Sequence, residues 1–273
     1  MRATDRLMVA LLALVFSGCA NVPTTLGSDT RQALAPTGKL RVAFIATAPT
    51  HAIKDSASGE LKGPAVDLGR EMARRIGVPF EAVPHTSFPP VLAAAKSGAW
   101  DIAMMGISAE REKYVDFTSP YMIVQFSYLV SNAFPVSSFA DVDRPGVRIA
   151  VLERSSPDAY LSRTLRNAAL VRLSTLPAVV QALRDGKVDA IYATKATVLA
   201  QSVKLPGSRV LDGHSGGEET AIAVPKGREL AAAYARQFVE AVKSEGIVKA
   251  AIDKAELVGV VVAPPGATSA STQ

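Results

Sequence analysis

The order of strand-like and helix-like segments is the feature that most constrains how this chain can fold. Residues 40–45 (LRVAFI) have the composition of a buried strand, and Pro64 opens a segment with apolar residues at every fourth position. Proline suits the first turn of a helix, and Gly77 is typical of the residue that ends one. A second strand follows at 80–83 and a third at 101–105. This alternation predicts an α/β fold.

A similar order of segments returns in the second half of the chain. Residues 95–102 (AKSGAWDI) and 183–190 (LRDGKVDA) both read as the end of a helix, a glycine stop, and a strand entered through aspartate. Two lobes built on one plan would produce this resemblance. Helix–glycine–strand units are common, so the resemblance favours two lobes without establishing them.

The end of the chain indicates a return to the first lobe. A strand at 221–225 precedes a long helix with Leu230, Tyr234, Phe238 and Val242 on one face, and nothing after it resembles a third lobe. The chain therefore crosses twice between the lobes, and two crossings form a hinge that can close around a ligand.

These patterns predict a signal peptide, a tether, two lobes and a tail. The first lobe comprises residues 38–124 and 220–258, the second residues 125–219, and each is expected to hold a mixed sheet flanked by helices. Residues 259–273 are rich in Pro, Gly, Ser and Thr, which predicts a disordered tail.

The N-terminus has the features of an export signal. Arg2 and Arg6 precede the apolar run 7–16, and small residues follow, which predicts a signal peptide over residues 1–19 and a periplasmic location. A buried N-terminal helix is the alternative. Residues 20–37 are polar and contain proline, as in a flexible tether.

Cys19 is the only cysteine, so it cannot form an internal disulfide. Residues 16–19 (FSGC) resemble the lipobox of bacterial lipoproteins, although Phe16 stands where leucine is usual. The resemblance implies a lipid on Cys19 as the only membrane attachment. Cleavage after Ala20, which would leave the protein free in the periplasm, remains the alternative.

Charge and composition exclude several classes of function. The net charge of +5 comes from scattered Lys and Arg, so no nucleic-acid-binding surface is expected. His51, His85 and His214 lack metal-ligand spacing, and no phosphate-binding or dinucleotide motif is present. We therefore expect no metal, no cofactor and a monomer.

Several motifs, in this order and spacing, resemble the bacterial extracellular solute-binding proteins of family 3. They are residues 38–42, 59–63 with 66–68, 98–103, 110–111 with 115–121, 141–142 with 146–151, and 221–227. The resemblance implies a two-lobed, type II periplasmic-binding-protein fold. It also implies a receptor that delivers a small ligand to the inner-membrane permease of an ABC importer.

The resemblance also implies ligand-binding residues. Arg111, five residues before the Asp-Phe-Thr motif, matches the arginine that holds a ligand carboxylate, although it could also be a surface residue of a charged run. Ser108, in the preceding loop, matches a hydroxyl that the family uses. Phe88 matches an aromatic that covers the ligand, or it belongs to the core. Ser155 and Ser156, at a helix N-terminus, could bind a carboxylate, cap the helix, or do both.

The departures from the family pattern concern the other end of the ligand. Thr194 stands where relatives that bind α-amino acids carry an acid for the ammonium group, and Arg154 replaces a glycine. The loop after the first strand offers Thr47 and Thr50 in place of an aromatic. We therefore expect a small organic acid, or an amino acid whose amine is met in another way, with Glu219 as the residue that could meet it.

Two enzyme hypotheses and one sensory hypothesis remain beside the receptor. Residues 213–217 (GHSGG) match G-x-S-x-G, but a nucleophile elbow needs a helix after the serine and a strand-like segment follows here. Some relatives are periplasmic dehydratases of cyclic carboxylic acids, for which Glu219 or Glu153 could supply a general acid. The same fold also serves as a sensory module, which here would need a membrane signalling partner.

Overall fold

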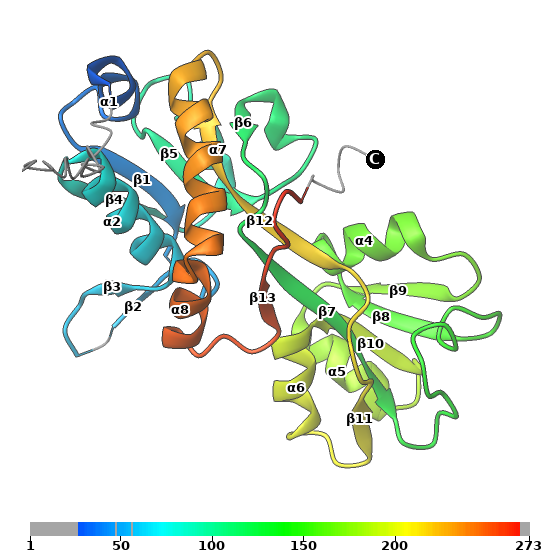
Figure 1. The fold of residues 1–273 in the computed structure, drawn as a ribbon. Coiled ribbons are helices and arrows are strands. Elements are labelled where there is room, and N and C mark those ends of the chain that lie inside the picture. Colours follow the sequence, from blue (N-terminus) through cyan, green and yellow to red (C-terminus); the bar gives the residue numbers. More distant parts are fainter. Residues whose placement is uncertain (1–26, 47, 56, 268–273) are drawn as a thin grey trace, which may run out of the picture.

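The computed structural model describes residues 27–46, 48–55 and 57–267. The predicted signal peptide, with Cys19, and Thr47 lie outside the described residues. Two lobes are visible, each a sheet flanked by helices, and two long strands connect them (Figure 1). The two-lobed α/β architecture predicted from the sequence is confirmed.

The two lobes share one topology. The first lobe contains, in chain order, β1 (Leu40–Ile45), α2 (Pro64–Ile76), β4 (Phe80–His85), α3 (Phe88–Ala93) and β5 (Ile102–Gly106). The second contains β8 (Arg148–Leu152), α4 (Ser156–Thr164), β9 (Ala169–Leu173), α5 (Leu176–Arg184) and β10 (Ala190–Thr194). Their strands lie parallel in the orders β4-β1-β5 and β9-β8-β10. The resemblance between residues 95–102 and 183–190 thus reflects equivalent positions in the two lobes.

An arginine–aspartate pair repeats at the same place in each lobe. Asp101 precedes β5 and accepts hydrogen bonds from the backbone N–H and the guanidinium of Arg41, on β1. Asp189 precedes β10 and accepts the same set from Arg148, on β8. Each pair joins the beginnings of two adjacent parallel strands, which explains the aspartate at both strand entries.

Two neighbouring strands cross between the lobes. β7 (Met122–Ser131) and β12 (Gly217–Pro225) pair antiparallel from Gly217↔Gln125 to Thr220↔Met122. β12 also pairs with β5 and β7 with β10, so the sheet continues as β4-β1-β5-β12-β7-β10-β8-β9. The predicted lobe boundaries at 124/125 and 219/220 fall inside these strands and stay predictions.

The remaining helices and strands complete the fold. They are α1 (Ser28–Leu34), β2 (Ile53–Lys54), β3 (Leu61–Lys62), the 3₁₀ helix η1 (Arg111–Lys113), β6 (Val115–Phe117), α6 (Lys195–Ser202), β11 (Ser208–Val210), α7 (Glu229–Ser244), α8 (Ile247–Lys254) and β13 (Val260–Val262). Within the described ranges, none of the helices has the length and apolarity needed to cross a bilayer.

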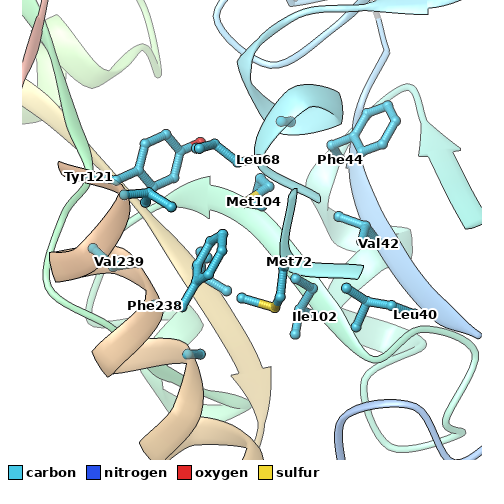
Figure 2. Packing of buried hydrophobic residues seen from close by; sticks show 14 of the residues in the cluster. Leu40, Val42, Phe44, Leu68, Met72, Ile102, Met104, Tyr121, Phe238 and Val239 are labelled. Carbon is cyan, nitrogen blue, oxygen red and sulfur yellow. The ribbon is translucent and has the colours of Figure 1, made fainter. Parts of the chain in front are cut away.

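The core of lobe 1 lies on both faces of its sheet. Figure 2 shows one face, where Met72 of α2 lies beside Phe238 of α7 and Leu68 of α2 lies beside Tyr121. Alternate residues of the same strands, such as Ala43 and Ala103, face the opposite side, toward α3. Burial on both faces explains why these strands read as nearly continuous apolar runs.

Predictions for the two ends of the body were wrong. Residues 28–34 were expected in the flexible tether but form α1, which buries Leu34 and whose Ala33 carbonyl accepts a hydrogen bond from Arg228. Residues 260–262 were expected in a disordered tail but form β13, which pairs with β7. Local composition misled because contacts with distant segments order both pieces.

One helical face also differs from expectation. Leu230 is 52% exposed, whereas Ala231, Ala235, Phe238 and Val242 form the buried stripe of α7. The prediction that Phe238 and Val242 lie on the buried face is confirmed, but the buried stripe begins at Ala231 instead of Leu230.

The arginine–aspartate pairs allow a matched stability test. Asp101 is fully buried and touches both Arg41 and Arg228, whereas the side chain of Asp189 is 24% exposed. Removing one partner of a buried ion pair costs about 3–5 kcal/mol. We expect Asp101→Asn to lower the free energy of unfolding by about 3 kcal/mol, and Asp189→Asn by clearly less. Urea unfolding measures both, and equal losses would contradict this account.

Candidate functional site

Arg111 lies where β5, β12 and η1 meet, as the first residue of η1. Its Nη1 donates a 2.5 Å hydrogen bond to the carbonyl of Gly106, at the end of β5, and its backbone N–H lies 3.4 Å from Ser108 Oγ. Burial lowers the pKa of Arg111, and the negative charges of Glu218 and Glu110 partly offset that effect. An arginine stays charged even so, which leaves a desolvated guanidinium able to bind an anion.

Two rings lie next to this guanidinium. The Arg111 side chain lies over the ring of Phe88, 4.0 Å from its centroid, in a cation–π contact. His51 packs against the same ring, with centroids 5.7 Å apart. His51 is 4% exposed and its Nδ1 has no hydrogen-bond partner in the described part of the chain. Burial, with a smaller contribution from Arg111, lowers the pKa of His51 to about 4, so the ring is neutral at pH 7.

Glu218 brings a carboxylate to the same place. Its Oε2 accepts a 2.7 Å hydrogen bond from Ser156 Oγ, at the start of α4 in lobe 2. Its Oε1 lies over Gly106: a β-carbon added to that glycine would be 2.4 Å from Oε1 and 3.2 Å from Arg111 Nη1. Glu218 therefore links the crossing strand to both lobes. We call Phe88, Gly106, Ser108, Arg111, Ser156 and Glu218 the junction site.

Local structure explains the position of Ser156. Ser155 caps α4 by accepting a hydrogen bond from the backbone N–H of Asp158. Arg154, where the resemblance to the family implies a glycine, adopts a left-handed φ of 61°, which a glycine would hold at less cost. Tyr160 of α4 packs on Gly216, whose φ is +73° and where any β-carbon would lie 2.4 Å from the ring. These constraints fix the beginning of α4 beside β12.

Of the eight predicted site residues, Phe88 and Ser108 each contact Arg111, and Ser156 contacts Glu218. Phe88, Ser108, Arg111 and Ser156 belong to the junction site. Ser155 is the helix cap of α4 described above. Thr194 is also a helix cap, because its Oγ1 accepts a hydrogen bond from Thr197 N–H at the start of α6. Thr50 lies in the turn before His51, half-buried.

Glu219, proposed from the sequence, is not the acid that faces Arg111. Thr220 pairs with Gly106, and side chains alternate along a strand, so Glu218 shares the face of Gly106 while Glu219 points to the other face. The backbone carbonyl of Glu219 accepts a hydrogen bond from Ile107. Counting from the Ala221–Pro225 strand identifies the two faces, but only the pairing with β5 shows which face lies beside Gly106.

Two other features, the G-x-S-x-G match and a surface depression, lie outside the junction site. Ser215 precedes β12 rather than a helix, and its carbonyl accepts the hydroxyl of Tyr192, so residues 213–217 do not form a nucleophile elbow. A depression of about 630 Å³ on lobe 1 is lined by Gln32, Lys96 and Arg228 among others and shares no residue with the junction site. Its Arg41 and Arg228 are already bound to Asp101.

Comparison with known proteins establishes the fold and the family. The fold is that of the type II periplasmic binding proteins: a binding component of an ABC transporter from Wolinella succinogenes, solved with lysine, aligns with a TM-score of 0.62 and 27% identity, over 80% of this chain and 95% of that one. The family model of "bacterial extracellular solute-binding proteins, family 3" matches residues 40–255. The chain therefore belongs to this family.

The relatives include proteins named as amino-acid-binding proteins and a protein named as an enzyme. The "Probable histidine-binding protein" of Neisseria gonorrhoeae is 28% identical over 249 residues, 87% of this chain and 89% of the relative. The cyclohexadienyl dehydratase of Pseudomonas aeruginosa is 26% identical over 148 residues, 53% of this chain and 55% of the enzyme.

The buried neutral His51 predicts a pH dependence of stability. In the unfolded chain the imidazole takes up a proton below its ordinary pKa of 6.5, whereas in the folded protein it does so only near pH 4. The contribution of neutral His51 to the free energy of unfolding is therefore complete above pH 6.5. It is lost as the pH falls toward 4, by up to about 3 kcal/mol. His51→Phe, which keeps a ring against Phe88, should remove this part of the acid destabilisation.

Urea unfolding at pH 7, 6, 5 and 4.5 measures the difference between the variant and the wild type. His214→Gln, at an exposed histidine, is the control and should follow the wild type. If His51→Phe has the wild-type pH profile, the neutral state of His51 is disproved.

Proposed function

We propose that this chain is the extracytoplasmic receptor of an ABC importer and captures a small carboxylate-bearing solute between its lobes. The observation that carries the proposal is the half-buried guanidinium of Arg111, which has one hydrogen bond from Nη1 to Gly106 and a ring beneath it. A planar guanidinium held in this way offers its remaining N–H groups to a carboxylate as a two-pronged donor.

The two-lobed fold supports capture by closure. Arg111 and Phe88 belong to the first lobe, Ser156 begins α4 in the second, and Glu218 lies on the strand that joins them. A solute bound here would contact both lobes and favour the arrangement in which they meet around it. Membership of family 3, and relatives named for amino acids, support a transport role with a membrane permease as partner.

A second candidate is a dehydratase of a cyclic carboxylic acid. The relative from Pseudomonas aeruginosa and the presence of Glu218 beside Arg111 favour it. Of the acids considered from the sequence, Glu153 is exposed and its carboxylate lies 3.7 Å from Arg154. Proton NMR of the protein with a cyclohexadienyl carboxylic acid separates the candidates, because a receptor returns the compound unchanged and a dehydratase releases a product.

Arg111 provides the test of carboxylate capture. We expect Arg111→Ala to weaken binding of the wild type's tightest solute at least 100-fold, because losing one partner of a desolvated charge pair costs about 2–5 kcal/mol. Arg111→Lys should recover only part of the loss, since an ammonium cannot donate in the planar paired geometry. Isothermal titration calorimetry with amino acids and small organic acids measures both.

Arg70→Ala is the control, because Arg70 is an exposed arginine of the same lobe that pairs with Glu60. It should bind like the wild type. Unchanged affinity in Arg111→Ala, or tight binding only of solutes without a carboxylate, would contradict the proposal.

We also propose that Cys19 is lipidated and anchors the receptor to the membrane facing the periplasm. The support is the position of the only cysteine at the end of an export signal. In cells that process lipoproteins, the wild type should enter the detergent phase of a Triton X-114 extraction and gain the mass of acyl chains. Cys19→Ser should remain in the aqueous phase. A wild type with residue 21 as its N-terminus and no acyl mass would show release by ordinary cleavage instead.

A further inference from the structure

Two opposite charges reach the same point of the junction site. The position that a β-carbon of Gly106 would take is flanked by Arg111 Nη1 and Glu218 Oε1. Within the described ranges neither residue has a direct ion-pair partner: Arg111 Nη1 donates to a backbone carbonyl, and Glu218 accepts a neutral hydroxyl. Each charge therefore keeps the capacity to bind an ionic group.

The spacing of these charges fits a particular kind of ligand. In an α-amino acid, one carbon atom carries both the ammonium and the carboxylate, through bonds of about 1.5 Å each. A carboxylate bound to Arg111 thus holds the ammonium within a few atoms of its contact, and Glu218 Oε1 lies near enough to Arg111 to be reached from there. Ser156 holds the other carboxylate oxygen of Glu218, so the acid is positioned before a ligand arrives.

We propose that Glu218 is the specificity-determining residue of this receptor and binds the cationic amine of a zwitterionic ligand whose carboxylate binds Arg111. This inference rests on the proposed function. It assigns to a residue of the crossing strand the role that Thr194 cannot perform, because Thr194 lacks a charge and its hydroxyl caps α6.

The Glu218 carboxylate also disfavours ligands that have a carboxylate but no amine. A simple organic acid on Arg111 would place its negative charge next to Glu218 without an amine between them. Like charges at such separations disfavour each other strongly away from bulk water. Glu218 therefore selects by repulsion as well as by attraction. The ligand class becomes amino acids rather than organic acids in general.

The test compares each amino acid with the same molecule lacking its amine. Titration calorimetry is performed with the twenty standard L-amino acids, L-cystine and their desamino carboxylic acids. The wild type should bind its best amino acid at least 100-fold more tightly than the matched desamino acid. Glu218→Gln keeps the length of the side chain and an oxygen for Ser156 but removes the charge. It should lose most of this preference, mainly through weaker binding of the amino acid.

Glu219→Gln is the matched control, because it removes an equal charge from the opposite face of the same strand, and it should retain the preference. Gly106→Ala is a second variant that leaves all charges in place. Gly106 is not among the glycines with positive φ, and the nearest obstacle to its new methyl group is the end of the Glu218 side chain. The protein should fold, with an unfolding temperature near that of the wild type, and bind the amino acid at least 10-fold more weakly.

The outcomes separate this inference from the proposed function. A desamino acid that binds the wild type as tightly as its amino acid would overturn the role of Glu218 and leave the receptor for carboxylates standing. A wild-type preference that survives in Glu218→Gln would do the same. If the wild type binds neither member of any pair, the proposed function fails and the inference fails with it.

Discussion

Backbone hydrogen bonds between β7 and β12 join two sheets that would otherwise be separate. The ladder is short, from Gly217↔Gln125 to Thr220↔Met122, and each strand continues into the sheet of one lobe. Much of the junction site is placed relative to it. Glu218 belongs to the ladder, Arg111 follows the strand that pairs with β12, and α4 packs on Gly216 just before β12 begins. A change in the twist of these two strands would move the groups of the two lobes relative to each other.

Much of the fold could be predicted from the sequence because its signals are local. Apolar runs, glycine stops and the aspartates before β5 and β10 are each readable within ten residues, and the repeated order of elements indicated two lobes. The ends of the body were mispredicted for the opposite reason. Leu34 is buried by α7 and neighbouring elements, and β13 is ordered by pairing with β7, so neither follows from its own composition.

The residues of the candidate site also divide into those that the sequence indicates and those that only the fold reveals. Arg111, Phe88, Ser108 and Ser156 were predicted as site residues from spacing that resembles a known family, and they stay predictions. Glu219 was predicted instead of its neighbour Glu218 because a sequence shows that two adjacent strand residues face opposite ways, but not which of them lies beside Gly106. His51, next to Phe88 in space, lies 37 positions earlier in the chain, and only the folded structure reveals that its ring is buried against that aromatic.

The side-by-side crossing has an evolutionary consequence. Because the chain leaves lobe 1 and re-enters it through adjacent strands, lobe 2 is in effect an insertion in a single loop of lobe 1. Such an insertion can be exchanged as one cassette without rearranging the host. An exchange would leave Arg111 and Phe88 in place and bring in a new α4. The two residues proposed to bind the carboxylate would then be inherited unchanged, while the contacts from α4 would come from a lobe of different ancestry.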